Sequence, residues 1–327
     1  MKRKILIVCI AFALIFVCAF FSEIRAYQKT EFLLDTYVTI NARGFNAKKA
    51  ANECFAKIKD FEQKCSVYIA SSDISRLNKM GEFSLQDETV RLIKNAKAYS
   101  AKTRGAFDIT VKPLTDLWNI KNFSRVPIDG EIAETLKKVG YNNIKISNNT
   151  VCLENGAQID LGGIAKGYLA DETAKIMQKY GVKDAILDLG GNIYTLGKKE
   201  IKIGLQNPSG ARGEYFGYVE GNNISVVTSG GYERFAELNG KKYHHIISPF
   251  DGKCAESGVL SASVIGKSSE KCDALATAIC VLGVKDGLEI INSEPDTECV
   301  IVDENNVVYL SDGANFKITD EKFVRGN

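Results

Sequence analysis

The sequence predicts an α+β protein in which mixed or antiparallel sheets carry packed helices. Two patterns lead to this class. Many short runs alternate apolar with polar residues, as a half-buried strand does, while a few longer runs space their apolar residues along one face of a helix. The two patterns do not alternate strictly along the chain, so a parallel βαβ arrangement is disfavoured.

Each expected element follows from one of these runs. Helices are expected at residues 47–64, 89–102, 165–180 and 269–282. Asn46 is a candidate cap for the first helix, and Ser71-Ser72-Asp73 is expected to cap a further helical turn. Strands are expected at residues 29–41, 66–69, 151–153, 158–161, 185–189, 193–196, 201–204, 224–227, 243–247, 260–265, 299–302 and 307–310. Asn155-Gly156 is expected to turn the chain between two of these strands.

Composition narrows the class of protein. The 327 residues are 45% hydrophobic and 25% charged, which is ordinary for a globular protein. The net charge is +2 and no long basic run carries interleaved aromatics, so no nucleic-acid partner is expected. The chain has no internal repeat and no low-complexity linker, which favours a single domain over residues 27–327.

The N-terminus differs from the rest of the chain. Lys2-Arg3-Lys4 precedes an unbroken apolar run over residues 5–21, which predicts a signal peptide or an N-terminal membrane anchor within residues 1–26. The positive flank places the remainder outside the cytoplasm. Ile24-Arg25-Ala26 is a mediocre cleavage site. Cys18 raises the question of lipidation, but the large residues before it favour an anchor or ordinary export.

The cysteines and histidines do not form a metal or disulfide framework. No C-x-x-C pair occurs, and an odd number of cysteines outside the leader cannot all pair, so scattered buried thiols are expected. These cysteines are Cys54, Cys65, Cys152, Cys254, Cys272, Cys280 and Cys299. The two histidines, His244 and His245, are adjacent, and they support a zinc site only weakly.

The stretch from Asp160 to Asp171 carries the strongest local signal. Gly162 and Gly163 let the backbone approach a ligand closely, and the helix expected to follow them presents free N–H groups to an anion. Lys166 adds a positive charge, so the stretch is typical of a phosphate-binding loop. The alternative is a tight turn with a solvated lysine.

A second stretch, residues 272–278, could bind a cation. Asp273 and Thr277 are four residues apart, so a helix would place both oxygen-bearing side chains on one face. With a backbone carbonyl from a nearby loop they would make a plausible Mg²⁺ site. In the alternative, the Thr277 hydroxyl bonds back to the carbonyl of Asp273.

Two further stretches offer a base and a ring. One of the adjacent histidines could accept a proton from a hydroxyl, or each could simply bond to backbone at a strand end. Phe107, in the stretch from Gly105 to Leu114, could stack on a ligand ring, although core packing is the default for such a residue. Ser229-Gly230-Gly231 is another possible phosphate-side loop.

Taken in order, these stretches resemble the ApbE family of FAD:protein FMN transferases. The matching segments are residues 66–78, 105–118, 139–141, 160–171, 190–192, 228–230, 245–252 and 273–278, and they run through nearly the whole exported part. Single segments are weak signals, but eight in the family's order are a strong one. The resemblance implies a single T-fold-like catalytic domain.

The resemblance also implies a chemistry and a set of site residues. FAD would be cleaved at its pyrophosphate in a Mg²⁺-dependent reaction, FMN would pass to a Thr or Ser hydroxyl of a target flavoprotein, and AMP would leave. The metal would be held by the Gly163 carbonyl, Asp273 and Thr277. FAD would contact Leu34, Tyr68, Ala106, Phe107, Asp108, Asp160, Lys166 and Ile247. His245 is the candidate base, with Asp273 as the alternative.

The implied partners are exported or membrane redox subunits with a Ser/Thr flavinylation motif. Two rival functions use the same residues: a Mg²⁺-dependent FAD pyrophosphatase, in which water attacks, and a non-catalytic FAD carrier. The sequence departs from the family pattern inside the site at two positions, since Leu34 stands where a methionine is frequent and Ser248 where an aspartate is usual.

Overall fold

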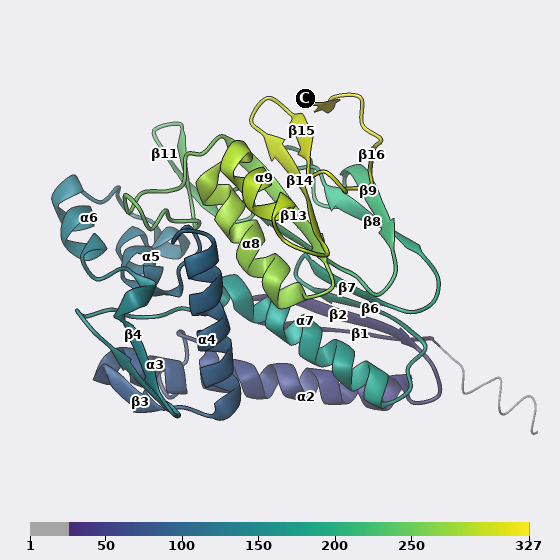
Figure 1. Cartoon of the computed structure of the whole chain (residues 1–327), viewed down its shortest axis with the longest axis horizontal. Coiled ribbons are helices and arrows are strands. Elements are labelled where there is room, and N and C mark those ends of the chain that lie inside the picture. Colours follow the sequence, from purple (N-terminus) through teal and green to yellow (C-terminus); the bar gives the residue numbers. More distant parts are fainter. Residues whose placement is uncertain (1–25, 327) are drawn as a thin grey trace, which may run out of the picture.

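A computed structural model describes residues 26–326, and its spine is a nine-stranded sheet (Figure 1). The strand order is β1-β2-β6-β7-β10-β13-β14-β15-β17, and all neighbours are antiparallel except the last pair. The bounds are β1 (Ala26–Leu33), β2 (Thr36–Arg43), β6 (Asp184–Leu189), β7 (Asn192–Leu196), β10 (Ser225–Gly230), β13 (Val259–Gly266), β14 (Thr297–Asp303), β15 (Val307–Leu310) and β17 (Val324–Arg325).

Helices cover one face of this sheet. In Figure 1, α7 and α8 cross in front of the sheet, α2 runs below α7, and α4 stands beside both α7 and α8. The larger helices are α2 (Ala47–Cys65), α4 (Asp87–Lys102), α7 (Gly162–Lys179), α8 (Ser269–Leu282) and α9 (Val284–Asn292). The shorter ones are α3 (Asp73–Met80), α5 (Lys112–Trp118), α6 (Asp129–Leu136) and the 3-10 turns η1 (Ile109–Val111), η2 (Ile120–Asn122) and η3 (Tyr141–Asn143).

Three small sheets complete the fold. Their orders are β3-β5-β4, β16-β9-β8 and β11-β12. The bounds are β3 (Glu82–Ser84), β4 (Ile144–Ser147), β5 (Thr150–Leu153), β8 (Ile201–Gln206), β9 (Tyr215–Gly221), β11 (Phe235–Leu238), β12 (Lys241–His244) and β16 (Phe316–Ile318). The sequence predicts an α+β fold with mixed or antiparallel sheets, and the structure confirms this prediction.

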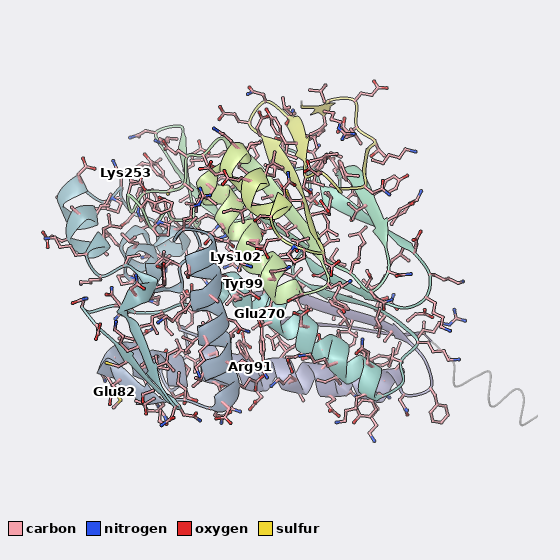
Figure 2. All side chains as sticks on the ribbon, viewed as in Figure 1. Glu82, Arg91, Tyr99, Lys102, Lys253 and Glu270 are labelled. Atoms are coloured by element: carbon pink, nitrogen blue, oxygen red, sulfur yellow. The ribbon has the colours of Figure 1, made fainter. Side chains whose placement is uncertain are left out.

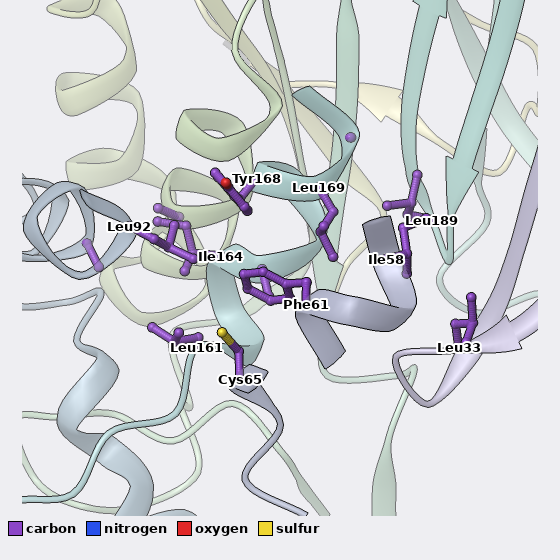
Figure 3. Packing of buried hydrophobic residues seen from close by; sticks show 14 of the residues in the cluster. Leu33, Ile58, Phe61, Cys65, Leu92, Leu161, Ile164, Tyr168, Leu169 and Leu189 are labelled. Atoms are coloured by element: carbon purple, nitrogen blue, oxygen red, sulfur yellow. The ribbon is translucent and has the colours of Figure 1, made fainter. Parts of the chain in front are cut away.

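The main core forms where α2 packs against α7. The apolar residues of α2 recur every three or four positions, so they share one face. Figure 3 shows Phe61 of α2 beside Ile164 and Leu169 of α7. The Phe61 ring lies 5.5 Å from the Tyr168 ring, centroid to centroid. Burial of a side chain of this size stabilises a fold by about 1.5–3 kcal/mol, so this face anchors α7 firmly.

The long helices were predicted well. Those expected at 47–64, 89–102 and 269–282 appear as α2, α4 and α8, and the Ser72 hydroxyl caps α3 by accepting from Ser75 N–H. Asn46 precedes α2, but its side chain does not cap it. Asn46 Nδ2 instead donates to the Tyr180 carbonyl at 3.2 Å, because that carbonyl lies at the end of α7.

Several turns were predicted wrongly. The strand expected over 29–41 is a hairpin, because Leu34 and Asp35 both adopt left-handed backbone (φ 57° and 58°). The chain turns at Asn148-Asn149, between β4 and β5, and these two strands form the hairpin. Asn155-Gly156 therefore joins no two strands, and residues 158–161 form no strand. Residues 66–69 are turns rather than extended chain. Left-handed asparagines at several sites made the turn signal ambiguous.

The expectations about thiols and the leader have different outcomes. All seven cysteines in residues 26–326 are free, and all but Cys152 are buried, which confirms the prediction of scattered buried thiols. The leader expected over residues 1–26 lies outside the described residues apart from Ala26, where β1 begins. Within residues 26–326, no helix has the length and apolar character needed to cross a bilayer.

Candidate active site

The predicted site residues gather at one end of the central sheet, where two strand turns meet α7 and α8. The β1–β2 and β6–β7 turns touch, since a Cβ on Gly190 would lie 2.4 Å from the Thr36 hydroxyl oxygen. The start of α7 reaches α8, since a Cβ on Gly163 would lie 3.8 Å from Thr277 Oγ1. Ser229, near the end of β10, places its hydroxyl 3.5 Å from the same Thr277 oxygen.

Gly167 brings α7 against α8 within this site. A Cβ on Gly167 would lie 2.2 Å from the Ser269 carbonyl oxygen and 2.7 Å from the Asp273 Cβ, so only glycine fits. This close approach lets the Gly167 N–H donate to Asp273 Oδ2 at 2.9 Å. The sequence therefore places a glycine where the phosphate-loop helix must contact the helix that carries the acid.

A second acid fixes the beginning of α8. Asp171, one turn further along α7, accepts hydrogen bonds from the N–H groups of Ser269 at 2.8 Å and Glu270 at 3.1 Å, and from the Ser268 hydroxyl at 3.0 Å. Free N–H groups at a helix start need such acceptors. Figure 2 shows the other side of α8, where Glu270 faces Tyr99 of α4. Together these contacts set the register of α8.

Asp273 is the buried carboxylate at the centre of the site. Only 2% of the residue is exposed, and burial raises the pKa of its carboxyl, while the Lys166 ammonium and the Gly167 N–H oppose that shift. A buried charge is tolerated where it is paired and hydrogen-bonded. Asp273 is thus placed to meet a cation in a region that excludes water.

Thr277 lies one turn along α8 from Asp273 and on the same side. Its hydroxyl faces Ser229 and Gly163, and no back-bond to the Asp273 carbonyl occurs within residues 26–326. The hydroxyl is therefore directed into the site. Asp273 and Thr277 thus lie on one face of α8, as the sequence predicts, and this face lies beside the start of α7.

These donors suit a hard cation. A carboxylate, a hydroxyl and a main-chain carbonyl supply oxygen ligands only, as Mg²⁺ prefers, and water and phosphate oxygens would complete its shell. In the described chain, no group of three or more His, Cys, Asp or Glu side chains is arranged to hold a metal, so a zinc-type cage is absent from residues 26–326. The chemistry of the donor set thus fits Mg²⁺.

Lys166 and Asn192 form the cationic side of the site. Lys166 Nζ donates to Asn192 Oδ1 at 3.2 Å. Asn192 is fully buried, and its Nδ2 is the one buried side-chain nitrogen or oxygen of residues 26–326 that lacks a hydrogen-bond partner. That nitrogen lies near the Asp273 carboxylate, and the Asn192 side chain helps lower the pKa of that carboxyl. Asn192 is therefore a buried donor between the Asp273 carboxylate and the Lys166 ammonium.

Asn192 belongs to a segment that resembles the family pattern, residues 190–192, but the sequence predicts no role for its side chain. Its burial could not be read from the sequence, because β7 begins at this residue and the strand pattern alone does not show what faces it. The signal that was present is the turn itself. Gly190 and Gly191 both have positive φ (65° and 92°), so the chain reverses tightly just before a polar side chain.

The first turn of α7 packs on an aromatic ring. A Cβ on Gly163 would lie 3.2 Å from the Phe107 ring, and Phe107 and Ala106 are buried. Asp160 closes the turn by accepting from the Gly162 N–H at 2.8 Å, and burial raises the pKa of its carboxyl. The packing alternative for Phe107 therefore holds, and the ring forms part of the wall of the site.

Asp108 secures the loop that carries Phe107. Its Oδ1 accepts from the N–H and hydroxyl of Thr110 at 2.8 and 2.7 Å, and its Oδ2 accepts from the Tyr141 N–H at 2.7 Å. Protein donors thus engage both oxygens. These hydrogen bonds hold the loop in place, and the contact of Asp108 with FAD that the resemblance implies stays a prediction.

The mouth of the site is polar and aromatic. Tyr68 is 74% exposed, and Lys121 Nζ lies 5.3 Å from its ring centroid. Asp35, in the β1–β2 turn, pairs with Lys121 at 3.4 Å and with Arg234 at 3.7 Å. Leu34 is fixed in the same turn, where its N–H donates to a side-chain oxygen of α2 at 2.8 Å. Asp35, Lys121 and Arg234 were not predicted, since they converge from distant segments.

His245 lies just beyond the end of β12 and has a defined protonation. Its Nδ1 is 3.2 Å from the Arg234 carbonyl, so Nδ1 donates and Nε2 keeps its lone pair. Burial lowers the pKa of His245 to about 4, and the Arg234 and Lys166 cations act in the same direction. His245 is therefore neutral near pH 7. His244 bonds the Ala255 carbonyl at 2.9 Å instead.

The departure at Ser248 is accommodated locally. Its Oγ accepts from the Phe250 N–H at 3.3 Å and its N–H donates to the Lys253 carbonyl at 2.8 Å, so the turn closes without a carboxylate. Ile247 is buried and packs with Trp118 in a small apolar cluster beside the site. Of the predicted contacts, Ile247 and Asp108 thus lie in supporting positions, while Lys166, Asp273 and Thr277 face one another around the start of α7.

Comparisons with known proteins identify the family and the fold of the chain. The model of the ApbE family matches residues 34–301. The FAD:protein FMN transferase of Treponema pallidum is 30% identical over 340 residues, covering 94% of this chain and 93% of that protein. The crystal structure of the ApbE protein of Thermotoga maritima shares 32% identity and a TM-score of 0.80, covering 91% of this chain and 97% of that chain. The apo flavinyl transferase ApbE of Pseudomonas stutzeri shares 25% identity and a TM-score of 0.77, with 91% and 95% coverage. The expected α+β fold and enzyme class are confirmed.

Proposed function

Because the chain belongs to the ApbE family, we propose that it transfers FMN from FAD to a Thr or Ser hydroxyl of an acceptor flavoprotein, in a Mg²⁺-dependent reaction that releases AMP. The observation that carries this proposal is the meeting of Asp273 and Thr277 with Lys166, beside the buried amide of Asn192. The pair Asp273 and Thr277 on α8 and the donors Lys166 and Asn192 therefore lie together where the start of α7 meets α8 and β7.

Asp273, Thr277 and the Gly163 carbonyl would hold Mg²⁺. When bound, the ion supplies charge neutralisation at the pyrophosphate of FAD. Lys166 and Asn192 add donors on the other side, where negative charge grows as the phosphoanhydride bond breaks. These groups are fixed before the substrate arrives, because Gly167 and Asp171 lock α7 against α8.

The transfer step needs a base for the incoming hydroxyl. Its oxygen attacks the phosphorus of the FMN half, the bond to the AMP phosphate breaks, and AMP leaves with the bridging oxygen. The hydroxyl proton passes to His245 Nε2, whose lone pair is available because Nδ1 is engaged by the Arg234 carbonyl. Asp273 is the alternative base. Tyr68, Phe107, Ala106 and Leu34 would enclose the flavin and adenine rings, with Ile247 packed behind them.

We further propose that the protein acts outside the cytoplasm. The basic residues at 2–4 followed by an apolar run over 5–21 support export with an N-terminal membrane anchor. The acceptors would then be exported or membrane redox subunits that carry a Ser/Thr flavinylation motif.

The test combines the purified chain with FAD, Mg²⁺ and a candidate acceptor. Transfer predicts covalent flavin on the acceptor, seen as in-gel fluorescence and as an FMN mass on a Thr or Ser peptide, together with an equal amount of AMP. Free FMN with AMP and no modified acceptor would identify a pyrophosphatase instead. Bound FAD without AMP would identify a carrier.

A further inference from the structure

The end of the central sheet opposite the active site gathers four turns around the beginning of β1. Ala26 pairs with Arg43, and Arg43 pairs in turn with Asp184. The turn after α7 joins them, since the Lys183 N–H donates to the Arg43 carbonyl at 3.1 Å. The β7–β8 and β9–β10 turns meet beside them, where the Gly197 N–H bonds a side chain of the latter at 3.1 Å. Figure 1 shows these strand ends together on the right.

This end is rich in exposed cations. Side chains from the four turns and the start of α2 contribute six exposed basic groups, namely Arg43, Lys48, Lys49, Lys183, Lys198 and Lys199. The carboxylates here are fewer. Glu53 is engaged by Lys179 at 3.2 Å and by the Tyr180 hydroxyl, and Glu220 pairs with Lys202 at 3.5 Å. Asp184 is half-buried, which leaves Glu200 exposed and without an ion pair among the described residues. The surface therefore carries excess positive charge, although the whole chain is nearly neutral.

An exposed aromatic side chain lies within this basic surface. Phe45 is 66% exposed in the turn between β2 and α2, two residues from Arg43 and three from Lys48. A bulky apolar side chain ringed by lysines is typical of surfaces that lie on an anionic bilayer, where the ring enters the headgroup region and the cations meet phosphates. Ala26, the first described residue, emerges at the same place, directly after the predicted anchor.

We propose that this basic end, defined as Phe45 with the six cations above, lies on the anionic phospholipid headgroups of the membrane. The inference rests on the membrane attachment put forward under Proposed function. The N-terminal anchor would keep the domain close to the membrane, and the basic end would determine which side of the domain faces it. Each cation near an anionic surface strengthens binding by about fivefold.

Such an orientation places the active site away from the bilayer. The site lies at the far ends of β1, β2 and β6, and β2 has eight residues. At roughly 3.3 Å per residue, the site would lie about 25 Å beyond the membrane-facing turns. The acceptor hydroxyl is then expected in a segment that projects from the membrane, rather than in one close to the headgroups.

The experiment measures lysine acetylation rates by mass spectrometry on the full chain, reconstituted in phosphatidylcholine vesicles with or without phosphatidylglycerol. We expect phosphatidylglycerol to slow labelling of Lys183, Lys198 and Lys199 by about threefold or more. Lys137 and Lys138 on the far side, next to α6, should label at the same rate in both vesicles. The double variant K198E/K199E should lose most of the protection at Lys183, whereas the matched K137E/K138E should keep it.

Equal rates at all these lysines in the two vesicle types would overturn the proposal. So would protection at Lys137 and Lys138, which would mean the opposite orientation, and so would protection that is equally strong without phosphatidylglycerol. The readout does not depend on flavin transfer. A chain that shows the labelling pattern but modifies no acceptor would contradict only the proposed function.

Discussion

The two faces of α7 differ in the interactions that they make with neighbouring helices. One face packs on α2 through apolar side chains such as Ile164 and Leu169, while the other meets α8 through a glycine, backbone N–H groups and buried acids. The first face is held by the burial of these apolar side chains. The second is held by hydrogen bonds and buries the Asp273 charge. The helix therefore joins a stabilising interface to a chemical one, and changes on the two faces should have separable effects.

The largest effect on stability is expected from the apolar face. Phe61→Ala removes a ring that packs on Tyr168 and leaves a cavity, which should lower the free energy of unfolding by about 3–5 kcal/mol. Urea unfolding followed by circular dichroism measures this. Phe61→Leu is the matched control and should lose less than about 1.5 kcal/mol. A folded Phe61→Ala protein should keep its rate of AMP release at low temperature; a rate loss equal to that of a site variant would abolish the distinction between the two faces.

The opposite behaviour is expected at Asp273. Asp273→Asn keeps an acceptor for the Gly167 N–H but removes the charge, so FMN transfer should fall by about 10²–10³-fold. The free energy of unfolding should change little, since a buried charge is costly to keep. AMP release under saturating FAD and Mg²⁺ measures the first effect. Wild-type activity in this variant would remove Asp273 from both the metal and the base assignments.

Substitutions of Thr277 test whether its hydroxyl takes part in Mg²⁺ binding beside Asp273. Thr277→Val removes the hydroxyl while keeping the shape of the side chain, and Thr277→Ser keeps the hydroxyl. We expect the Mg²⁺ concentration needed for half-maximal transfer to rise by about tenfold in the first variant and to be nearly restored in the second. Equal behaviour of the two variants would show that the hydroxyl serves only packing.

The pH dependence tests His245. Its folded-state pKa is lowered to about 4, so it is neutral from pH 6 to 8 and transfer should show no step from its titration in that range. The lowered pKa also means that stability is fully present above the unfolded value near 6.5 and is lost as the pH falls toward 4, because the unfolded chain takes up the proton first. His245→Ala should reduce transfer by about 10²-fold. Full-rate transfer by His245→Ala across pH 6 to 8 would exclude it as the base.

Sequence patterns predicted the residues on regular helices better than the residues that reach the site through turns. The apolar face of α2 could be predicted because helical spacing shows directly which residues share a face. The pair Asp273 and Thr277 could be predicted for the same reason. Asn192, Asp35 and Arg234 could not be assigned, since each reaches the site through a turn whose partner lies far along the chain. The β1–β2 hairpin was missed because Leu34 and Asp35 adopt left-handed backbone without a glycine.

The smallest effect on transfer is expected from Asp171 of α7, which contacts the start of α8. Asp171→Asn keeps the shape but removes the charge that accepts from two N–H groups and one hydroxyl at this helix end. Loss of a helix cap costs about 0.5–2 kcal/mol, so unfolding should become easier by about 1 kcal/mol. Asp171 of α7 contacts the first residues of α8, which lie about two helical turns from Thr277, so transfer should fall by less than about threefold at a temperature where the variant is folded. Thermal unfolding and AMP release on the same sample measure both quantities. A loss of transfer as large as that of Asp273→Asn, with stability unchanged, would mean that Asp171 acts in the chemistry and that the α8 start belongs to the active site rather than to its support.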